Sequence, residues 1–586
     1  MVRNRALSFC AILLTAVVFT ARFAEAQDAE ILMRGHLAAG EFGPARALAD
    51  SIKNPALRDR ALAQIAAAQA GVGARNASVY TASYIGSDLV RGQTLGDIGS
   101  MLIGRRFGGG FGGGPVADFD SLIELITSTI EPESWDEVGG PGSIDGFEGG
   151  VYVDGAGLLK RIEFKPGSPS LATIRNKAAA STGNADVRRA SRLRKVSLTR
   201  LEKQAQMLDA LGRDPDDVMK SLAGLYKIQY ILIYPETGDI VLAGPAGDWV
   251  VNAEGRKVNV DTGQPVLALD DLVTCVRNAM EQNSRFGCSI TPRKENLAAA
   301  QKLLAKPDLR NPRYREQLRS ALGNQDIEVY GIDHRSRVAR IIVEADYRMK
   351  LLAMDIEEGT VGVPSYLDLL KPSPDGKLPP SDVIRWWFAL NYDALHATKD
   401  RQAFEIRGQG VKVLSETELV TETGERKHTG KSSVPAMEFA HGFTKHFDLL
   451  AKKYPVYAEL RNVFDLALVA ALLKSEDMAG QVGWHMTFFG APKGNDHTKY
   501  QVELGPAAKE VATIMNHRSI EGAKRRTPTG FTSLRITVLG VSGGVVIDPN
   551  SLVKRDAIKT DNYGLMKAER AASTPKGLQH HAWWWD

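Results

Sequence analysis

The stretch Tyr226–Leu242, YKIQYILIYPETGDIVL, indicates the kind of fold at the centre of this chain. Ile228, Tyr230, Leu232 and Tyr234 recur at every second position, as side chains do on one face of a strand. A Pro-Glu-Thr-Gly turn follows, and a second apolar run begins behind it. This pattern is typical of a β-hairpin, so we expect a sheet-rich region to begin here.

A second alternating stretch begins at Val338. Apolar residues occupy every second position up to Tyr347 and charged residues lie between them, with Ile342 as the exception. We therefore expect a strand with one buried face. From Met349 the apolar spacing becomes helical, and Gly359 fits the end of that helix.

Helical patterns lie on the C-terminal side of these strands. Ala436–Ala451 carries aromatic residues at helical spacing, Pro455 interrupts the pattern, and a second apolar helix runs to about Leu473. These features predict a helical hairpin or a bent helix pair over residues 431–475. The later stretch Leu534–Asp548 predicts two strands around a glycine turn.

The region before the strands, residues 27–78, is expected to be helical throughout. Asn54 and Pro55 are suited to the cap and the first position of a helix. An Ala-Ala-Gly triplet ending at Gly40 recurs as Gln-Ala-Gly ending at Gly71, a period that resembles helix-pair repeats of the tetratricopeptide kind. Because fewer than two repeats are present, a helical cap packed on the next domain is the favoured interpretation.

The N-terminus predicts export. Arg3 and Arg5 precede the apolar stretch Ala6–Ala21, and Ala24-Glu25-Ala26 supplies the small residues that a signal peptidase requires. We expect cleavage between Ala26 and Gln27. The alternative is an uncleaved anchor, but the apolar stretch is shorter than the roughly 20 residues that span a bilayer.

Charge and hydropathy then limit the classes of protein. The formal net charge of +4 falls to about +2 once residues 1–26 are removed, so nothing points to nucleic acid as a partner. The most apolar later stretch, Phe464–Leu473, is too short to cross a membrane.

The fold class expected is multi-domain α+β. The glycines in RRFGGGFGGGP, Arg105–Pro115, indicate a linker. The stretch from Arg175 to Lys203 contains nine basic residues and two acidic ones, which indicates a solvated basic segment. Binding of a polyanion is the alternative for this segment. The expected divisions are a signal peptide (1–26), a helical repeat-like segment (27–78), a Gly-rich linker (79–117), a small α/β module (118–165), a basic helical linker (166–205), a central α+β core (206–430), the helical hairpin (431–475), a strand-containing C-terminal part of the core (476–550) and a flexible tail (551–586).

Only Cys275 and Cys288 remain after signal cleavage. In an exported protein an even pair of cysteines predicts a structural disulfide. A reactive or metal-binding pair is the alternative, but it lacks suitable neighbouring residues.

Two carboxylates are the candidates for catalysis. On the predicted strand Glu344 and Asp346 share a face, as an acid/base pair would. Arg340 and Arg348 flank them, however, and such a row is usual for an ordinary salt-bridged sheet surface. The motif Gly540–Gly544, GVSGG, matches a serine nucleophile elbow, but a strand follows it where the elbow requires a helix. No cofactor or metal is expected.

Several stretches resemble a planctomycete family of exported proteins with a domain of unknown function, number 1598. They are Asp118–Ile123 continuing through Trp135–Glu137 and Gly139–Gly142, Leu193–Leu198, Phe286–Ile290 and Val343–Lys350. The resemblance runs from about residue 118 to 550 and implies an envelope or secreted location with no assigned activity. LITSTIEPESWDEVGGPGSI also resembles a segment of secretin-like proteins.

These observations favour a non-enzymatic exported protein, periplasmic or extracellular, that binds a protein partner or an envelope polymer. Two alternatives remain. One is a secreted hydrolase of cell-wall or polymeric substrate, for which Glu344 and Asp346 are the first residues to test. The other is a component of a secretin-like outer-membrane assembly.

Overall fold

The structure is a computed structural model. It describes residues 32–107, 143–147, 150–154, 185–305, 311, 313–372, 383–492, 498–527, 530–538, 542–560, 573–575, 578 and 582–586. The predicted signal peptide, the Ala26–Gln27 cleavage site and the glycine run that ends at Pro115 lie outside these residues, apart from Arg105–Phe107. Two compact units are formed, one from Met1–Leu102 and Ala185–Asp586 and the other from Ile103–Asn184.

The described part of the smaller unit contains one antiparallel pair of strands, β1 (Ser143–Phe147) and β2 (Gly150–Asp154). Most of the small α/β module predicted at 118–165 lies outside the described residues.

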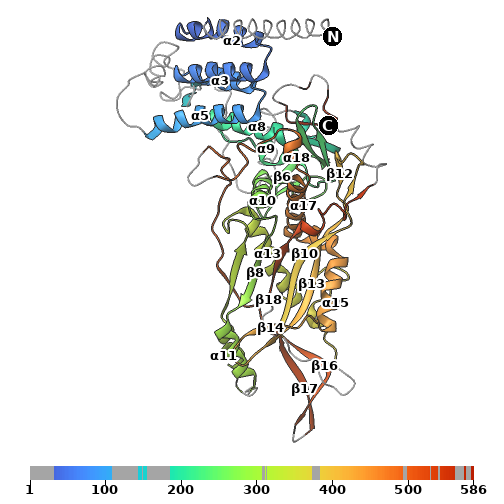
Figure 1. Ribbon diagram of the computed structural model, residues 1–586. Helices are drawn as coiled ribbons and strands as arrows, with labels where there is room; N and C mark the ends of the chain where they lie inside the picture. The colour runs from blue at the N-terminus through green and yellow to red at the C-terminus, as the bar shows by residue number, and fades with distance from the viewer. Residues whose placement is uncertain are drawn as a thin grey trace, which may run out of the picture. The chain divides into compact units, whose positions relative to one another are not determined.

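The larger unit begins with helices (Figure 1). They are α2 (Phe42–Ser51), α3 (Pro55–Gly71), α4 (Arg75–Ser83) and α5 (Asp88–Phe107). As predicted, Pro55 begins a helix and the Asn54 side chain accepts a hydrogen bond from the Leu57 amide. Alanine, leucine and isoleucine side chains from these helices form a core of their own.

The Gly-rich linker predicted over 79–117 is wrong up to residue 107, because α4 and α5 occupy this stretch. The glycines of α5 serve close packing. A Cβ atom at Gly92 would lie 2.5 Å from Thr487 Cβ, and one at Gly96 would lie 3.6 Å from Thr498 Cβ. Small residues on this face let the helix approach Thr487 and Thr498 closely.

Two mixed sheets form the centre of the larger unit. The first has the order β14 (Arg426–His428), β13 (Gly408–Val420), β10 (Val383–Tyr392), β18 (Ser542–Ile547), β8 (Phe286–Pro292), β9 (Asn324–Tyr330), β15 (Glu510–Ala512). The second has the order β19 (Lys559–Thr560), β11 (His396–Ala397), β12 (Ala403–Glu405), β4 (Tyr230–Tyr234), β5 (Asp239–Ala246), β3 (Ser191–Ser197), β20 (Trp584–Trp585). The predicted hairpin is confirmed as β4 and β5, which pair antiparallel around the turn. A multi-domain α+β protein is therefore present, as expected.

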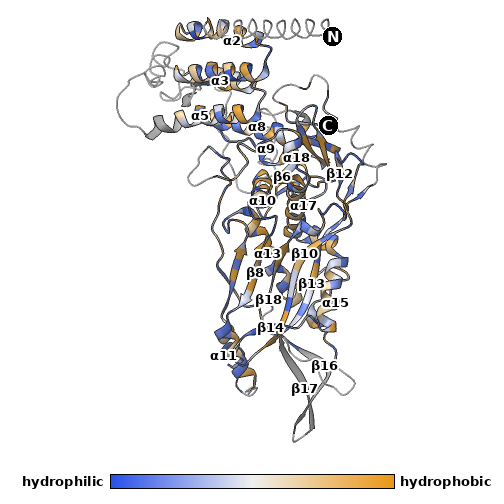
Figure 2. Cartoon of the chain, in the orientation of Figure 1, coloured by the Kyte–Doolittle hydropathy of each residue, from blue (hydrophilic) through white to orange (hydrophobic). Residues whose placement is uncertain are grey.

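A further set of helices in this unit contacts the first sheet or one another. They are α10 (Leu269–Glu281), α11 (Lys294–Ala305), α12 (Tyr314–Leu322), α13 (Arg337–Ala353), α14 (Tyr366–Leu369), α15 (Val434–Lys445), α16 (Phe447–Lys453) and α17 (Pro455–Ser475). α13 contacts β8 and β18, while α15 and α17 contact β13. The helices predicted on both sides of Pro455 are thus confirmed. Figure 2 shows the apolar character of α17, whose residues are buried along most of its length.

None of the helices that the structure describes is both long and apolar enough to cross a membrane. α17 spans 21 residues but carries Glu459, Arg461 and Asp465.

The strand predicted from Val338 is wrong, because residues 337–353 form helix α13. Ser336 caps the helix by accepting a hydrogen bond from the Ala339 amide. The fully buried positions include Val338, Ile342, Ala345, Met349 and Leu352, which recur at helical spacing. The helix also buries part of its other side, and these additional apolar residues produce the misleading alternation.

The predicted basic helical linker 166–205 is also wrong where the structure describes it. Its second half forms β3 and the start of α8 (Leu198–Ala210). Arg194 is completely buried and donates hydrogen bonds to both carboxylate oxygens of Asp586, each at 2.9 Å. The flexible tail predicted at 551–586 therefore ends in an ordered strand, β20, paired with β3.

The two strands predicted in 534–548 are present as β17 (Gly530–Val538) and β18. They do not pair with each other. β17 pairs with β16 (Asn516–Thr527), whereas β18 lies between β10 and β8.

The predicted disulfide is wrong: Cys275 and Cys288 are free and buried. Cys275 lies on α10 with its Sγ atom 4.0 Å from the Val463 carbonyl oxygen of α17, while Cys288 lies on β8. Burial raises the pKa of both thiols, and the charge of Asp346 adds to this effect at Cys288. Both residues therefore act as small apolar side chains of the core.

Candidate functional site

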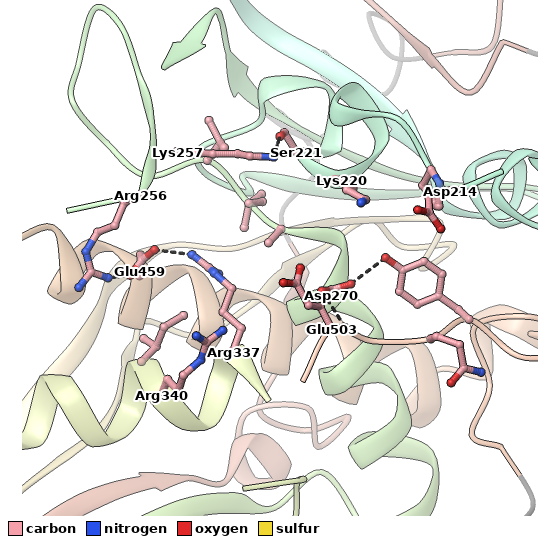
Figure 3. A pocket seen from close by; sticks show the side chains of 18 of the residues that line it. Asp214, Lys220, Ser221, Arg256, Lys257, Asp270, Arg337, Arg340, Glu459 and Glu503 are labelled. Atoms are coloured by element: carbon pink, nitrogen blue, oxygen red, sulfur yellow. Dashed lines mark hydrogen bonds and ion pairs between the residues drawn. The ribbon is translucent and has the colours of Figure 1, made fainter. Parts of the chain in front are cut away.

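A cleft of about 760 Å³ lies in the larger unit and is lined mainly by charged side chains (Figure 3). We call it the charged cleft. Its lining comes from the segment after α8, the turn between β6 (Trp249–Val251) and β7 (Lys257–Asn259), the starts of α10, α13 and α17, Phe488, and the segment Tyr500–Glu503. Segments far apart in sequence thus meet in one polar depression.

The floor of the charged cleft is organised by Glu459, whose side chain is only 3% exposed. One of its carboxylate oxygens accepts a hydrogen bond from Arg256 and the other accepts one from Arg337. Figure 3 shows the two arginines on either side of this carboxylate. Arg337 also pairs with the buried Asp271 of α10, and Arg256 pairs with Glu344 of α13. The network therefore connects the β6–β7 turn, α10, α13 and α17.

One wall of the cleft is fixed by Asp270. It accepts a hydrogen bond of 2.7 Å from the Tyr500 hydroxyl and one of 3.2 Å from the Glu503 amide. Burial and the charge of Asp270 raise the pKa of Tyr500, so the tyrosine remains a hydrogen-bond donor. Arg277 anchors the same segment by donating to the Tyr500 carbonyl oxygen at 2.6 Å.

Three cations of the cleft have no carboxylate partner among the described residues. Arg213, Lys220 and Arg340 are exposed, and none of them forms an ion pair with another described side chain. They come from the segment after α8, from α9 (Asp217–Lys220) and from α13. Such cations can bind a ligand without first breaking an internal ion pair.

The cleft also presents carboxylates, among them Asp209, Asp214 and Glu503. The protein removes part of the water around the Asp209 carboxylate, and the Asp214 charge adds repulsion. Together they raise the pKa of Asp209 to about 6, although its side chain reaches the surface. The cleft therefore offers charges of both signs to a ligand.

The two residues proposed as a catalytic pair are not brought together. Two positions on a helix differ by about 200°, so Glu344 and Asp346 point to different sides of α13. Glu344 lines the cleft, whereas Asp346 is fully buried, with an oxygen 2.9 Å from the Lys350 Nζ atom. Burial raises the pKa of Asp346, and Lys350 opposes this shift. The prediction that they share one face is wrong because the predicted strand is a helix.

Space for the buried pair is provided by Gly543 of β18. A Cβ atom there would lie 2.5 Å from Asp346 Oδ1 and 2.6 Å from the Trp386 carbonyl oxygen. The strand can therefore pass over Asp346 only because this position has no side chain.

Two serines form hydrogen bonds with ionisable side chains, as a catalytic serine nucleophile would. Neither of them is suited to that role. Ser542 of the GVSGG motif is buried in β18 and donates a hydrogen bond of 2.8 Å to Glu418. Ser221 accepts a hydrogen bond from Lys257, but Lys257 also pairs with Asp217, which favours the charged amine, and Ser221 is fully buried. The described residues contain no cluster of metal-ligating side chains.

One residue of α17 is a signal for the cleft in the sequence itself. Glu459 lies in an otherwise apolar helix, and a carboxylate in such a place needs a cationic partner. Nothing in the local sequence indicated that Arg256 and Arg337, 81 residues apart, would supply it.

Fold and cleft together define an α+β protein with a preformed, charged cleft. A family model described as a protein of unknown function, DUF1598, matches residues 288–366. That range carries Arg337, Arg340 and Glu344 of the charged cleft and the buried Asp346–Lys350 pair. No curated protein and no solved structure matches the chain.

Proposed function

We propose that this chain is an exported, non-enzymatic binding protein whose charged cleft holds a charged segment of a protein partner or an envelope polymer. The observation that carries the proposal is a set of exposed cations, Arg213, Lys220 and Arg340, which face one preformed cleft and have no carboxylate partner in the described part of the chain. The predicted signal peptide and the resemblance to exported planctomycete proteins support a periplasmic or extracellular location.

The distribution of charge favours a ligand with charges of both signs. Arg340 and Lys220 are well separated in Figure 3, and Asp270 and Glu503 lie between them in that view. A purely anionic polymer would be repelled by these carboxylates. A polypeptide segment, or a polymer with both amino and acidic groups, would not be repelled in this way, because its cationic groups can lie beside the carboxylates.

Site-specific photo-crosslinking in the native host tests this proposal. A photoreactive residue replaces Gln501, which is exposed and lines the cleft, and a matched control replaces Glu422, an exposed residue of the β13–β14 turn. We expect a discrete adduct from position 501 only, and its loss in the triple variant Arg213→Glu/Lys220→Glu/Arg340→Glu. Equal labelling at both positions, or an adduct that survives the charge reversal, would rule out the cleft as the binding site.

A hydrolase of cell-wall or polymeric substrate is the second candidate, favoured by the raised pKa of Asp209 beside Asp214. A carboxylic acid that titrates near neutral pH is suited to general acid catalysis. Release of soluble fragments from purified cell wall, abolished in Asp209→Asn, would support this candidate. Binding without fragment release would support the binding protein.

A further inference from the structure

A second and smaller pocket, of about 270 Å³, lies outside the charged cleft. It forms where α5 meets α8, the β4–β5 turn and the segment around Trp484. The junction is closely packed, because Gln206 of α8 donates a hydrogen bond of 3.1 Å to the Gly92 carbonyl oxygen and the His485 amide donates one of 2.8 Å to Asp88. We call this cavity the junction pocket.

Three cationic side chains line the junction pocket: Arg91 from α5, and Arg200 and Lys203 from α8. The two carboxylates that line it are already engaged. Asp88 pairs with Arg91, and Asp239 accepts hydrogen bonds of 2.7 and 3.3 Å from two nitrogens of Arg200. The lining therefore has more positive than negative charge.

Two further observations concern the positive charge that the described residues place in this pocket. The Nε atom of Arg91 is buried and has no hydrogen-bond partner among the described residues. The pKa of Lys203 is lowered to about 7, first by burial and then by the charges of Arg91 and Arg200, while Asp88 opposes the shift. A negative group in the pocket would add to the compensation of the Arg91 charge and favour the charged form of Lys203.

We propose that the junction pocket binds a small oxyanion, either a free sulfate- or phosphate-type ion or the terminal phosphate group of a larger molecule. Two guanidinium groups and an amine in a small pocket match the geometry and charge of such an anion. Bound there, the anion would connect α5 of the N-terminal helices to α8. The inference is independent of the function proposed for the charged cleft, because the two sites share no lining residue.

Calorimetric titration of the full mature chain with sodium sulfate tests the proposal at constant ionic strength, with chloride as the balancing salt. Sulfate itself does not titrate near neutral pH. An anion beside Lys203 stabilises its charged form, so we expect binding with proton uptake at pH 7 to 8 and an affinity that falls as the pH rises above 7. Among the described residues, the charged groups that line the pocket together with Lys203 are Arg91 and Asp88 of α5, Arg200 of α8 and Asp239 of β5.

The decisive variant is Lys203→Gln. It removes an amine that is costly to bury, so the fold should be retained, as the thermal midpoint will show. We expect sulfate affinity to fall about tenfold or more and proton uptake to disappear. The matched control Lys452→Gln removes an exposed lysine of α16 that lines neither pocket and should leave sulfate binding unchanged. Absence of saturable sulfate binding, or unchanged binding in Lys203→Gln, would overturn the inference.

Competition experiments separate the two sources of the anion. If glycerol 3-phosphate displaces sulfate at least as well as inorganic phosphate does, the pocket accepts a terminal phosphate group. Displacement by inorganic phosphate alone identifies a site for the free ion. Displacement by neither would contradict the proposed phosphate class.

Discussion

Helix α13 carries two sets of charged residues that differ completely in their surroundings. On one side Arg337, Arg340 and Glu344 face the charged cleft, and the Glu344 side chain is 40% exposed. On the other side Asp346 and Lys350 are 0% and 1% exposed beneath β18. The buried charges pair with each other, and Lys350 also donates a hydrogen bond to the Ile290 carbonyl oxygen, whereas water and a ligand can reach the cleft charges. The comparison teaches that access to solvent, more than residue type, separates a structural ion pair from a binding surface.

The largest effect is expected from breaking the buried pair. Asp346→Ala leaves Lys350 charged beneath the sheet, and we expect the free energy of unfolding to fall by about 3–5 kcal/mol. Denaturant unfolding measures the loss. The double variant Asp346→Asn/Lys350→Met removes both charges at similar size and should lose less. A cost below about 1 kcal/mol for Asp346→Ala would contradict a buried, structural pair.

A smaller effect is expected at the floor of the charged cleft. Glu459→Gln keeps the size of the side chain but leaves Arg256 and Arg337 without their shared carboxylate, at a cost of about 1.5–3 kcal/mol in unfolding free energy. Glu254→Gln is the matched control. It removes an exposed partner of Arg256 and should change stability by less than about 0.5 kcal/mol. Equal losses from the two variants would show that Glu459 does not organise the floor.

At the rim of the cleft the expected change is in a pKa. The side-chain carbon resonance of Asp209 should titrate with a pKa of about 6, measured by NMR. Asp214→Asn removes a neighbouring negative charge, so the pKa of Asp209 should fall toward its ordinary value. A titration that is the same in both proteins would leave loss of hydration as the sole cause.

The smallest effect on stability is expected at Arg340. This guanidinium forms no ion pair with a described residue, so Arg340→Gln should change the unfolding free energy by less than about 0.5 kcal/mol while weakening the cleft adduct. Comparing it with Asp346→Ala places both faces of α13 in one unfolding assay. Destabilisation similar to that of Asp346→Ala would remove the distinction between the two faces.

Local patterns in the sequence were sufficient for many elements of the fold. The β4–β5 hairpin and the helices around Pro455 were predictable because their turns and apolar spacing depend on nearby residues. The cap at Asn54 was predictable for the same reason. In each case the decisive interaction joins residues close in sequence.

The errors share a different physical cause. Helix α13 is buried on more than one side, so apolar residues occur around most of its circumference. In sequence they alternate with charged residues, as the residues of a half-buried strand do. The disulfide expectation used only the number of cysteines and the predicted export, whereas Cys275 and Cys288 are placed by α10 and β8. Glu459 and its arginines meet through tertiary packing, so the charged cleft was not predictable from spacing alone.

The pairing of β3 with β20 has a consequence for folding kinetics. Arg194 and Asp586, which pair there, are 392 residues apart in the chain. During synthesis β3, at the edge of the second sheet, remains without its neighbour β20 until the residues between the two strands have been made. Contacts so distant in sequence slow folding, and an unpaired edge invites association with other chains in the meantime. Until β20 docks, the free edge of β3 is therefore open to pairing with strands of other chains.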